Sequence, residues 1–308
     1  MGSGLKVEIG LAGFPTKEQM IKLSPALPAM RAAELPWLSV GDRASQQSVF
    51  RLLSECGLAL EFADCLLSNS CSDMEQTACD LAPRVKTIGP LLAGSRLRQF
   101  DGNFWQEDTE CLRWLDRQPP NSVIYVAFGS FTTFDKRQFQ ELALGLELCN
   151  RSFLWVVRPD LIDASSAADY FPDGFRARIG DRGQIVGWSP QQKVLAHPSI
   201  ACFVTHCGWN STTEGLSNGV PFLCWPYFSD QKLNLAYICH VWKVGLALEK
   251  DGDGIVSREE MKGKIQALVG DEGLKARSLE LKGIVRKSVV EGGSSFKNFN
   301  DFVEAMKQ

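Results

Sequence analysis

Short apolar runs alternate with amphipathic or mixed segments through the second part of the chain. Runs typical of buried strands lie at Ser122–Phe128, Phe153–Val157, Gln184–Val186, Ile200–Val204 and Pro221–Trp225, and a shorter one lies near Leu246. Because parallel strands need helical crossovers between them, this alternation predicts an α/β fold with a doubly wound parallel sheet.

The segment after the first run has the periodicity of a helix that packs on a sheet. Its apolar residues follow an i, i+3, i+4, i+7 spacing and are Phe139, Leu142, Ala143 and Leu146. Further along, Ser257 and Glu260 have the spacing of a capping box, which predicts a second helix start.

The first part of the chain carries fewer strand signals. Helical spacing predicts helices over Ala44–Leu60 and Asp73–Leu81, and short apolar runs predict strands over Ala63–Leu67 and Val85–Leu92. Before them, residues 1–38 contain four prolines and little periodicity, which is typical of a connecting region. Since a parallel sheet needs more than two strands, we expect residues 1–95 to be the remnant of a larger domain.

Changes in composition suggest the remaining boundaries. Residues 96–120 begin with a polar, glycine-containing stretch, typical of a linker, and continue into a short helix predicted at Glu107–Asp116. Residues 121–290 are predicted to form the second domain. Residues 291–308 are predicted to contain the last helix.

Composition excludes several classes of partner. The chain has 308 residues and a net charge of −3, without a basic tract, so neither a nucleic acid nor an anionic membrane surface is expected to bind it. It contains no apolar run of about 18 residues, the length that a membrane-spanning helix needs. Its ten cysteines include no CxxC pair, which favours reduced thiols in a cytoplasmic protein.

The most informative stretch runs from Trp188 to Gln231. At its centre the apolar run Ile200–Val204 passes through a glycine-containing turn into Asn210-Ser211-Thr212-Thr213, a typical helix start. A helix N-terminus presents unpaired N–H groups and the positive end of the helix dipole, so it favours a phosphate. We therefore expect a phosphate-bearing ligand there.

This stretch closely resembles the signature box of plant small-molecule UDP-glycosyltransferases. The resemblance implies the GT-B fold of two Rossmann-like domains, here with an incomplete N-terminal domain, and UDP-glucose as the donor substrate. It also implies that the last helix, within residues 291–308, crosses back to the N-terminal domain. It implies no metal and no further cofactor. The box departs from the family pattern at Ser189, where Ala is commoner, and at Thr213, where Leu is commoner.

The resemblance also implies roles for individual residues toward the nucleoside. Trp188 would stack on the uracil, and the backbone of Ser189 would lie at the uracil edge. Gln191 would contact the ribose, and Glu214 would accept hydrogen bonds from both ribose hydroxyls, which suits a carboxylate with two acceptor oxygens.

Further residues of the family pattern would hold the diphosphate and the sugar. The expected diphosphate site comprises Ser130 in the turn after the first strand, His206, Gly208, Asn210 and Ser211. The sugar hydroxyls would meet Trp209, Asp230 and Gln231, and a terminal Gln in this box points to glucose rather than galactose.

The catalytic base of the family has no counterpart in this sequence. The resemblance places that base at a histidine near the start of the N-terminal domain, whereas the three histidines here are His197, His206 and His240. One hypothesis is an inverting glucosyltransferase acting on a hydroxyl of a small lipophilic acceptor. The alternative is a truncated UDP-sugar-binding remnant without transferase activity.

Other motif matches are weaker. Ser217 lies in a GxSxG pattern, but a hydrolase nucleophile must lie at a turn from a strand into a helix. Here the pattern follows a predicted helix and precedes a predicted strand. Asp251-Gly252-Asp253-Gly254 lacks the later ligands of a calcium loop. The spacing of His197, Cys202, His206 and Cys207 fits no common zinc site. A nicotinamide-dependent enzyme is disfavoured because no GxGxxG turn follows a predicted strand.

Overall fold

The computed structural model describes residues 20–22, 27–92, 105–161 and 170–307. The chain divides into two compact units. Unit 1 comprises Met1–Leu91, Pro226–Val241 and Gly283–Gln308, and unit 2 comprises Leu92–Trp225 and Trp242–Lys282. Residues 96–104 of the predicted linker lie outside the described residues, and the domain boundaries proposed from the sequence stay predictions.

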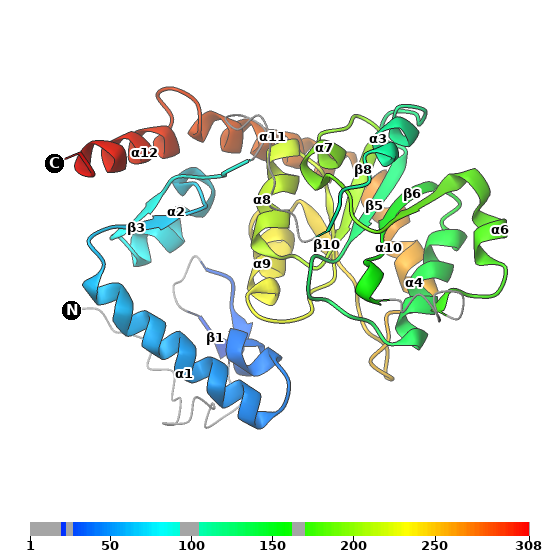
Figure 1. The fold of residues 1–308 in the computed structure, drawn as a ribbon, viewed down its shortest axis with the longest axis horizontal. Coiled ribbons are helices and arrows are strands. Elements are labelled where there is room, and N and C mark those ends of the chain that lie inside the picture. Colours follow the sequence, from blue (N-terminus) through cyan, green and yellow to red (C-terminus); the bar gives the residue numbers. More distant parts are fainter. Residues whose placement is uncertain (1–19, 23–26, 93–104, 162–169, 308) are drawn as a thin grey trace. The chain divides into compact units, whose positions relative to one another are not determined.

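Unit 2 is built on a six-stranded parallel sheet with the strand order β10-β9-β8-β5-β6-β7 (Figure 1). Its strands are β5 (Val123–Ala127), β6 (Ser152–Val156), β7 (Gly183–Val186), β8 (Ile200–Thr205), β9 (Phe222–Cys224) and β10 (Gly245–Ala247). The chain adds β6 and β7 on one side of β5, then returns to add β8, β9 and β10 on the other. The predicted doubly wound parallel sheet is confirmed, and each predicted strand of this part is present.

Helices cover both faces of this sheet. On one face the buried apolar side of α4 (Lys136–Leu148) joins α6 (Phe175–Ile179) and α10 (Arg258–Gly270) in a single core with Ile124 and Val126 of β5. On the other face Gly215 of α8 (Trp209–Asn218) lies against Phe203 and Phe222. Unit 2 also contains α3 (Glu110–Leu115), η4 (Pro159–Leu161), η5 (Gly180–Arg182), α7 (Gln191–Leu195) and the first part of α11 (Glu272–Ser288).

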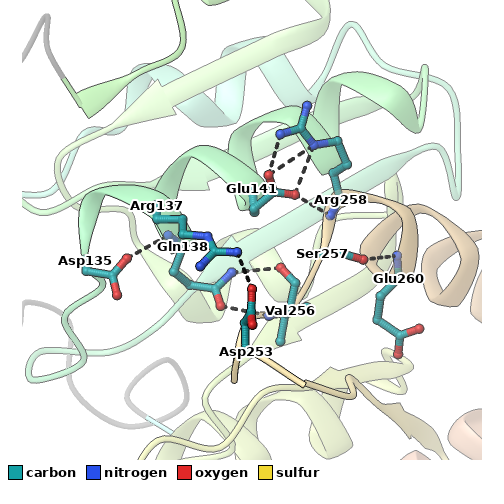
Figure 2. A network of polar contacts seen from close by, with 9 residues as sticks. All are labelled: Asp135, Arg137, Gln138, Glu141, Asp253, Val256, Ser257, Arg258 and Glu260. Carbon is teal, nitrogen blue, oxygen red and sulfur yellow. Dashed lines mark hydrogen bonds and ion pairs between the residues drawn. The ribbon is translucent and has the colours of Figure 1, made fainter. Parts of the chain in front are cut away.

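Polar contacts join α4 to Val256 and to the first residue of α10 (Figure 2). The Gln138 amide is buried and forms two hydrogen bonds with the main chain of Val256, each 2.9 Å long. The Glu141 carboxylate accepts from the main-chain N–H of Arg258 at 2.8 Å and from its guanidinium. Since Val256 and Arg258 are far from α4 in sequence, these contacts fix a long-range junction.

The predicted capping box at Ser257 is only half formed. The Ser257 hydroxyl accepts from the N–H of Glu260 at 3.1 Å, as predicted. The Glu260 carboxylate instead accepts from the N–H of Glu249 at 3.0 Å. The side chain therefore joins the segment after β10 to α10 rather than closing the cap.

Unit 1 combines segments from distant parts of the chain. Its strands form an antiparallel pair, β1 (Met20–Ile21) with β2 (Met30–Arg31), and a parallel pair, β3 (Leu66–Ser68) with β4 (Val85–Thr87). Its helical segments are η1 (Ala32–Glu34), η2 (Pro36–Ser39), α1 (Arg43–Ala59), η3 (Leu60–Phe62), α2 (Ser72–Leu81), α9 (Gln231–Ala236), the π-helical turn η6 (Tyr237–Val241), α12 (Ser294–Ala305) and the end of α11.

Three predictions for unit 1 need correction. Strand β4 ends at Thr87 rather than Leu92, because Pro90 has no N–H to continue a ladder. Strand β3 begins at Leu66 rather than Ala63 because the 3-10 turn η3 extends to Phe62. The segment predicted as a plain connection, in its described part, forms a small apolar cluster of Ile21, Met30, Ala32 and Leu35.

Helix α1 was predicted from its apolar spacing, and the helix is confirmed. Within the described residues, however, the helix buries none of its side chains, and Leu52 is 57% exposed.

In the part of the chain that the structure describes, no helix combines the length and the apolar character needed to cross a bilayer.

Candidate functional site

The candidate site in unit 2 lies at the point where the sheet changes winding direction. Strands β5 and β8 are neighbours in the sheet, and the chain leaves them in opposite directions. In open α/β sheets, ligands bind beyond the carboxyl ends of strands at such a switch point. The turn containing Gly129 and Ser130 follows β5, and His206 to Gly208 follow β8.

His206 brings these two turns together. A Cβ atom added to Gly129 would lie 2.6 Å from His206 Nε2, and one added to Gly208 would also clash with that atom. Gly129 further has a φ of +67°, which side chains of L-residues rarely permit. The imidazole is therefore packed tightly between the main chains of two glycine-containing turns.

The turn after β8 leads directly into α8. Cys207 has a left-handed φ of 64°, and its N–H donates to the Thr205 hydroxyl at 3.2 Å. Gly208 is then the N-cap of the helix, so the predicted diphosphate residues Asn210 and Ser211 lie in the first turn of α8. Asn210 is exposed and Ser211 is buried. This N-terminus has the features that favour an anion.

A network of amides surrounds the predicted ribose acceptor Glu214. Gln191 Nε2 donates to Glu214 Oε2 at 2.7 Å and to the Ser211 hydroxyl at 2.9 Å. Gln192 Nε2 donates to the second carboxylate oxygen of Glu214 at 2.9 Å. Burial raises the pKa of Glu214, and the hydrogen bonds from Gln191 and Gln192 oppose this rise. The structure thus brings Gln191, Ser211 and Glu214 together and adds Gln192, which the sequence had not suggested.

Tyr125 completes the network, and sequence reasoning missed it. Its hydroxyl lies 2.9 Å from Ser189 Oγ and donates to Gln191 Oε1 at 3.1 Å. Burial raises the Tyr125 pKa, so the hydroxyl keeps its proton. Because Ile124 and Val126 point to the α4 face, strand alternation directs Tyr125 to the α7 and α8 side. A tyrosine between apolar strand residues could have signalled this role.

Trp188 and Ser189 lie just before α7. Trp188 is half-buried, and its carbonyl accepts from the N–H of Asp108 at 2.8 Å. The Ser189 side chain is buried against Tyr125. Trp209, at the first position of α8, is half-buried, and its ring centroid lies 6.5 Å from that of Trp242. The proposed contacts of these residues with uracil and sugar stay predictions.

A buried arginine supports the turn that contains Ser130, and sequence reasoning missed this residue too. Arg158 follows β6, and its side chain is 3% exposed. Its Nη1 donates to the carbonyls of Gly129 at 2.8 Å and Thr132 at 3.1 Å. Its Nε pairs with Asp160 at 3.0 Å. An Arg-Pro pair at the end of a predicted strand was the available signal.

The predicted sugar contacts Asp230 and Gln231 belong to unit 1. Gln231 Oε1 accepts from the N–H groups of Tyr227 at 2.7 Å and Phe228 at 3.0 Å. Asp230 Oδ2 accepts from Asn234 Nδ2 at 2.8 Å. The amide oxygen of Gln231 thus organises its own turn, and a role toward a sugar stays a prediction.

The weaker motifs have local partners. Ser217 lies inside α8, where its hydroxyl donates to the Thr213 carbonyl at 2.6 Å, so it is not at a strand-to-helix turn. Asp251 accepts from the N–H groups of Asp253 and Ile255, both at 2.9 Å. Among the described residues, no group of three or more His, Cys, Asp or Glu side chains is arranged to hold a metal ion.

Comparisons with known proteins identify the family. A profile described as "UDP-glucoronosyl and UDP-glucosyl transferase" matches residues 102–291. The chain is 44% identical over 292 residues to UDP-glycosyltransferase 83A1 of Arabidopsis thaliana, covering 93% of this chain and 60% of that protein. It is 35% identical over 305 residues to linamarin synthase 1 of Manihot esculenta, covering 94% of this chain and 61% of that protein.

Solved structures give the same result. UGT2 of Phytolacca americana, complexed with UDP-2fluoro-glucose and pterostilbene, is similar with a TM-score of 0.80 and 30% identity, over 94% of this chain and 63% of that one. Os79 of O. sativa in complex with UDP has a TM-score of 0.70 and 34% identity, over 85% and 57% of the two chains.

These neighbours have the GT-B fold of two Rossmann-like domains, as predicted for this chain. The chain spans about three fifths of the length of the curated relatives that it matches. The profile match covers more than half of the chain, and it includes the switch point and the network around Glu214. The chain belongs to the UDP-glucoronosyl and UDP-glucosyl transferase family.

Proposed function

We propose that unit 2 binds a UDP-sugar at the switch point between β5 and β8. The observation that carries this proposal is the half-buried Glu214 carboxylate, held by Gln191 and Gln192 close to the first turn of α8. A carboxylate has about four lone pairs, so two amide donors leave capacity for the two ribose hydroxyls. The adjacent helix N-terminus then suits the diphosphate.

The reaction proposed for the protein is transfer of glucose from UDP-glucose to a hydroxyl of a small lipophilic acceptor, with inversion at the anomeric carbon. This type of transfer needs a base for the acceptor proton and stabilisation of the departing diphosphate. Unit 2 would supply the second requirement. Family membership supports the transferase assignment, and Gln231 supports glucose as the sugar.

A second candidate is donor binding without transfer by this chain. The surroundings of two of its histidines favour it. His206 Nε2 packs against Gly129 and Gly208, and His197 lies 2.8 Å from the Ser199 hydroxyl and 3.2 Å from Asp116. Both imidazoles are therefore engaged in local structure rather than presented to an acceptor hydroxyl.

Calorimetric titration of the 308-residue chain with UDP tests donor binding. We expect saturable binding, which Glu214→Ala weakens by about tenfold or more because the ribose loses a charged acceptor. Glu110→Ala, which removes an exposed carboxylate from α3, is the matched control and should bind like the wild type. Equal affinity of wild type and Glu214→Ala would refute the ribose role.

Product analysis separates the two candidates. The wild-type chain is incubated with UDP-glucose or UDP-galactose and a set of small phenols and alcohols, and glycosides are detected by mass spectrometry. Glucoside formation supports the transferase. Donor binding without any glycoside supports the second candidate, and preference for UDP-galactose would contradict the role of Gln231.

A further inference from the structure

Arg158 is a buried cation at the end of β6, outside the signature stretch from Trp188 to Gln231. Taking a cation out of water is costly unless it is paired and hydrogen-bonded. Here the guanidinium satisfies that condition by bonding at once to Asp160 and to the carbonyls of Gly129 and Thr132. The fork of an arginine can reach three such acceptors, whereas a lysine offers a point charge.

We propose that Arg158 is a positioning residue for the donor diphosphate, acting through the turn Gly129–Thr132. This inference rests on the proposed binding of a UDP-sugar. Because the peptide unit is planar and trans, a carbonyl and the N–H of the next residue point in opposite directions. Holding the Gly129 carbonyl toward Arg158 therefore directs the N–H of Ser130 away from it.

The turn is held from two neighbouring strands. Arg158 follows β6 and binds the turn through its carbonyls, while His206 follows β8 and packs against Gly129. Strand β5 lies between β6 and β8 in the sheet, so both contacts act on the turn that follows the carboxyl end of β5. A preorganised turn binds an anion without the cost of ordering the loop.

The geometry predicts an effect that depends on the phosphates of the ligand. Arg158 contacts the turn with Ser130, whereas Glu214 and Gln191 form the proposed ribose site. Loosening the turn should weaken binding of UDP and leave binding of uridine nearly unchanged. The ratio of the two affinities therefore reports positioning and is insensitive to a general loss of stability.

The test measures UDP and uridine affinities by calorimetry for the wild type, Arg158→Lys and Arg158→Gln. We expect both variants to lose about tenfold in UDP affinity and less than about twofold in uridine affinity, because UDP must then order the loosened turn as it binds. Arg178→Lys is the control, since Arg178 pairs with Glu147 on the surface. Its UDP to uridine ratio should match the wild type.

Asp160→Asn provides a second variant if the Arg158 variants fail to fold. The Asp160 carboxylate accepts from Arg158 Nε at 3.0 Å and from Nη2 at 3.3 Å. Weakening this pair should lower the ratio of UDP affinity to uridine affinity, as the Arg158 variants do, but by a smaller factor. A wild-type ratio in Arg158→Lys, or in Asp160→Asn when the former is unfolded, would overturn the inference. Failure of the wild type to bind either ligand would instead refute the proposed function.

Discussion

Glu214 is a half-buried carboxylate, and its ionisation should control donor affinity. Burial raises its pKa, so on acidification it takes up a proton at a higher pH than an ordinary glutamate. The protonated form has lost part of its acceptor capacity for ribose. We expect UDP affinity to fall as the pH is lowered toward this raised pKa, measured as the dissociation constant between neutral and mildly acidic pH.

The matched variant for this pH dependence is Glu214→Gln. Its UDP affinity should be about tenfold lower at neutral pH, because a charged acceptor is replaced by a neutral amide. The phosphates of UDP titrate in both proteins, so only the difference between the two profiles reports Glu214. Parallel profiles of wild type and Glu214→Gln would contradict a titrating role for this carboxylate.

Gly129 combines a left-handed backbone with a close approach to His206. Gly129→Ala should lower the free energy of unfolding by about 1–3 kcal/mol more than the same substitution at a left-handed glycine in open space. The extra loss arises because the new methyl group at Gly129 must displace the imidazole. Gly254→Ala is the control, since Gly254 has a φ of +79° with no heavy atom within 4 Å of the added Cβ. Urea denaturation measures the free energy of unfolding of both variants. Equal losses of stability would mean that the imidazole moves aside without an energetic cost.

At the scale of elements, α4 and α10 are joined by an ion pair that titrates (Figure 2). Hydrogen bonds from Arg258 lower the pKa of Glu141 below its ordinary value. A lowered folded-state pKa stabilises the protein above the ordinary pKa of glutamate, and this contribution is lost as the pH falls through the lowered pKa. We expect Glu141→Gln to reduce the free energy of unfolding by about 1–2 kcal/mol at neutral pH, since the variant loses hydrogen bonds between charged groups.

The ion pair between Glu110 and Arg113 is the control for this contact. Both of its side chains are well exposed, at 66% and 75%. Exposed pairs of this kind contribute about 0–1 kcal/mol, so Glu110→Gln should change stability little. Denaturant titrations at neutral and acidic pH should show the Glu141→Gln effect shrinking on acidification. An effect that persists at acidic pH would mean that lost packing, not lost charge, destabilises this variant.

The elements that sequence patterns predicted best are those with a strong local signal. Helix α4 has an apolar stripe with the period of a helix, and the six strands of unit 2 are short apolar runs between polar segments. The ends of β3 and β4 were predicted less well, because apolar spacing alone does not show where strand pairing stops. The Glu260 side chain binds Glu249, which local capping rules could not anticipate.

At the scale of the whole molecule, the sequence predicted a phosphate-bearing ligand at the helix start after Ile200–Val204, and it singled out Gln191, Ser211 and Glu214, which hydrogen bonds join in the structure. It did not predict Tyr125 or Arg158, whose contacts reach residues far away in the chain. In the sequence Tyr125 resembles a core residue of a strand, and Arg158 resembles an ordinary polar residue after one. Such roles depend on strand order, which periodicity does not specify.

In unit 1, Asn298 joins α12 to β4, two segments that are far apart in the sequence. Its Nδ2 donates at 2.9 Å to the carbonyl of Thr87, a residue that is 3% exposed at the end of β4. Asn298→Ala would leave this carbonyl without its donor, at a cost of about 1–3 kcal/mol for a buried group. We therefore expect α12 and β4 to open together more often.

Hydrogen exchange followed by mass spectrometry can detect this opening. Peptides from α12 and from β4 should exchange faster in Asn298→Ala, while peptides from α4 in unit 2 should exchange at the wild-type rate. Asn300→Ala, an exposed substitution in the same helix, controls for a change in helix propensity. A cooperative opening must expose the amides of both α12 and β4. Faster exchange in α12 alone would therefore contradict the expectation that the two segments open together.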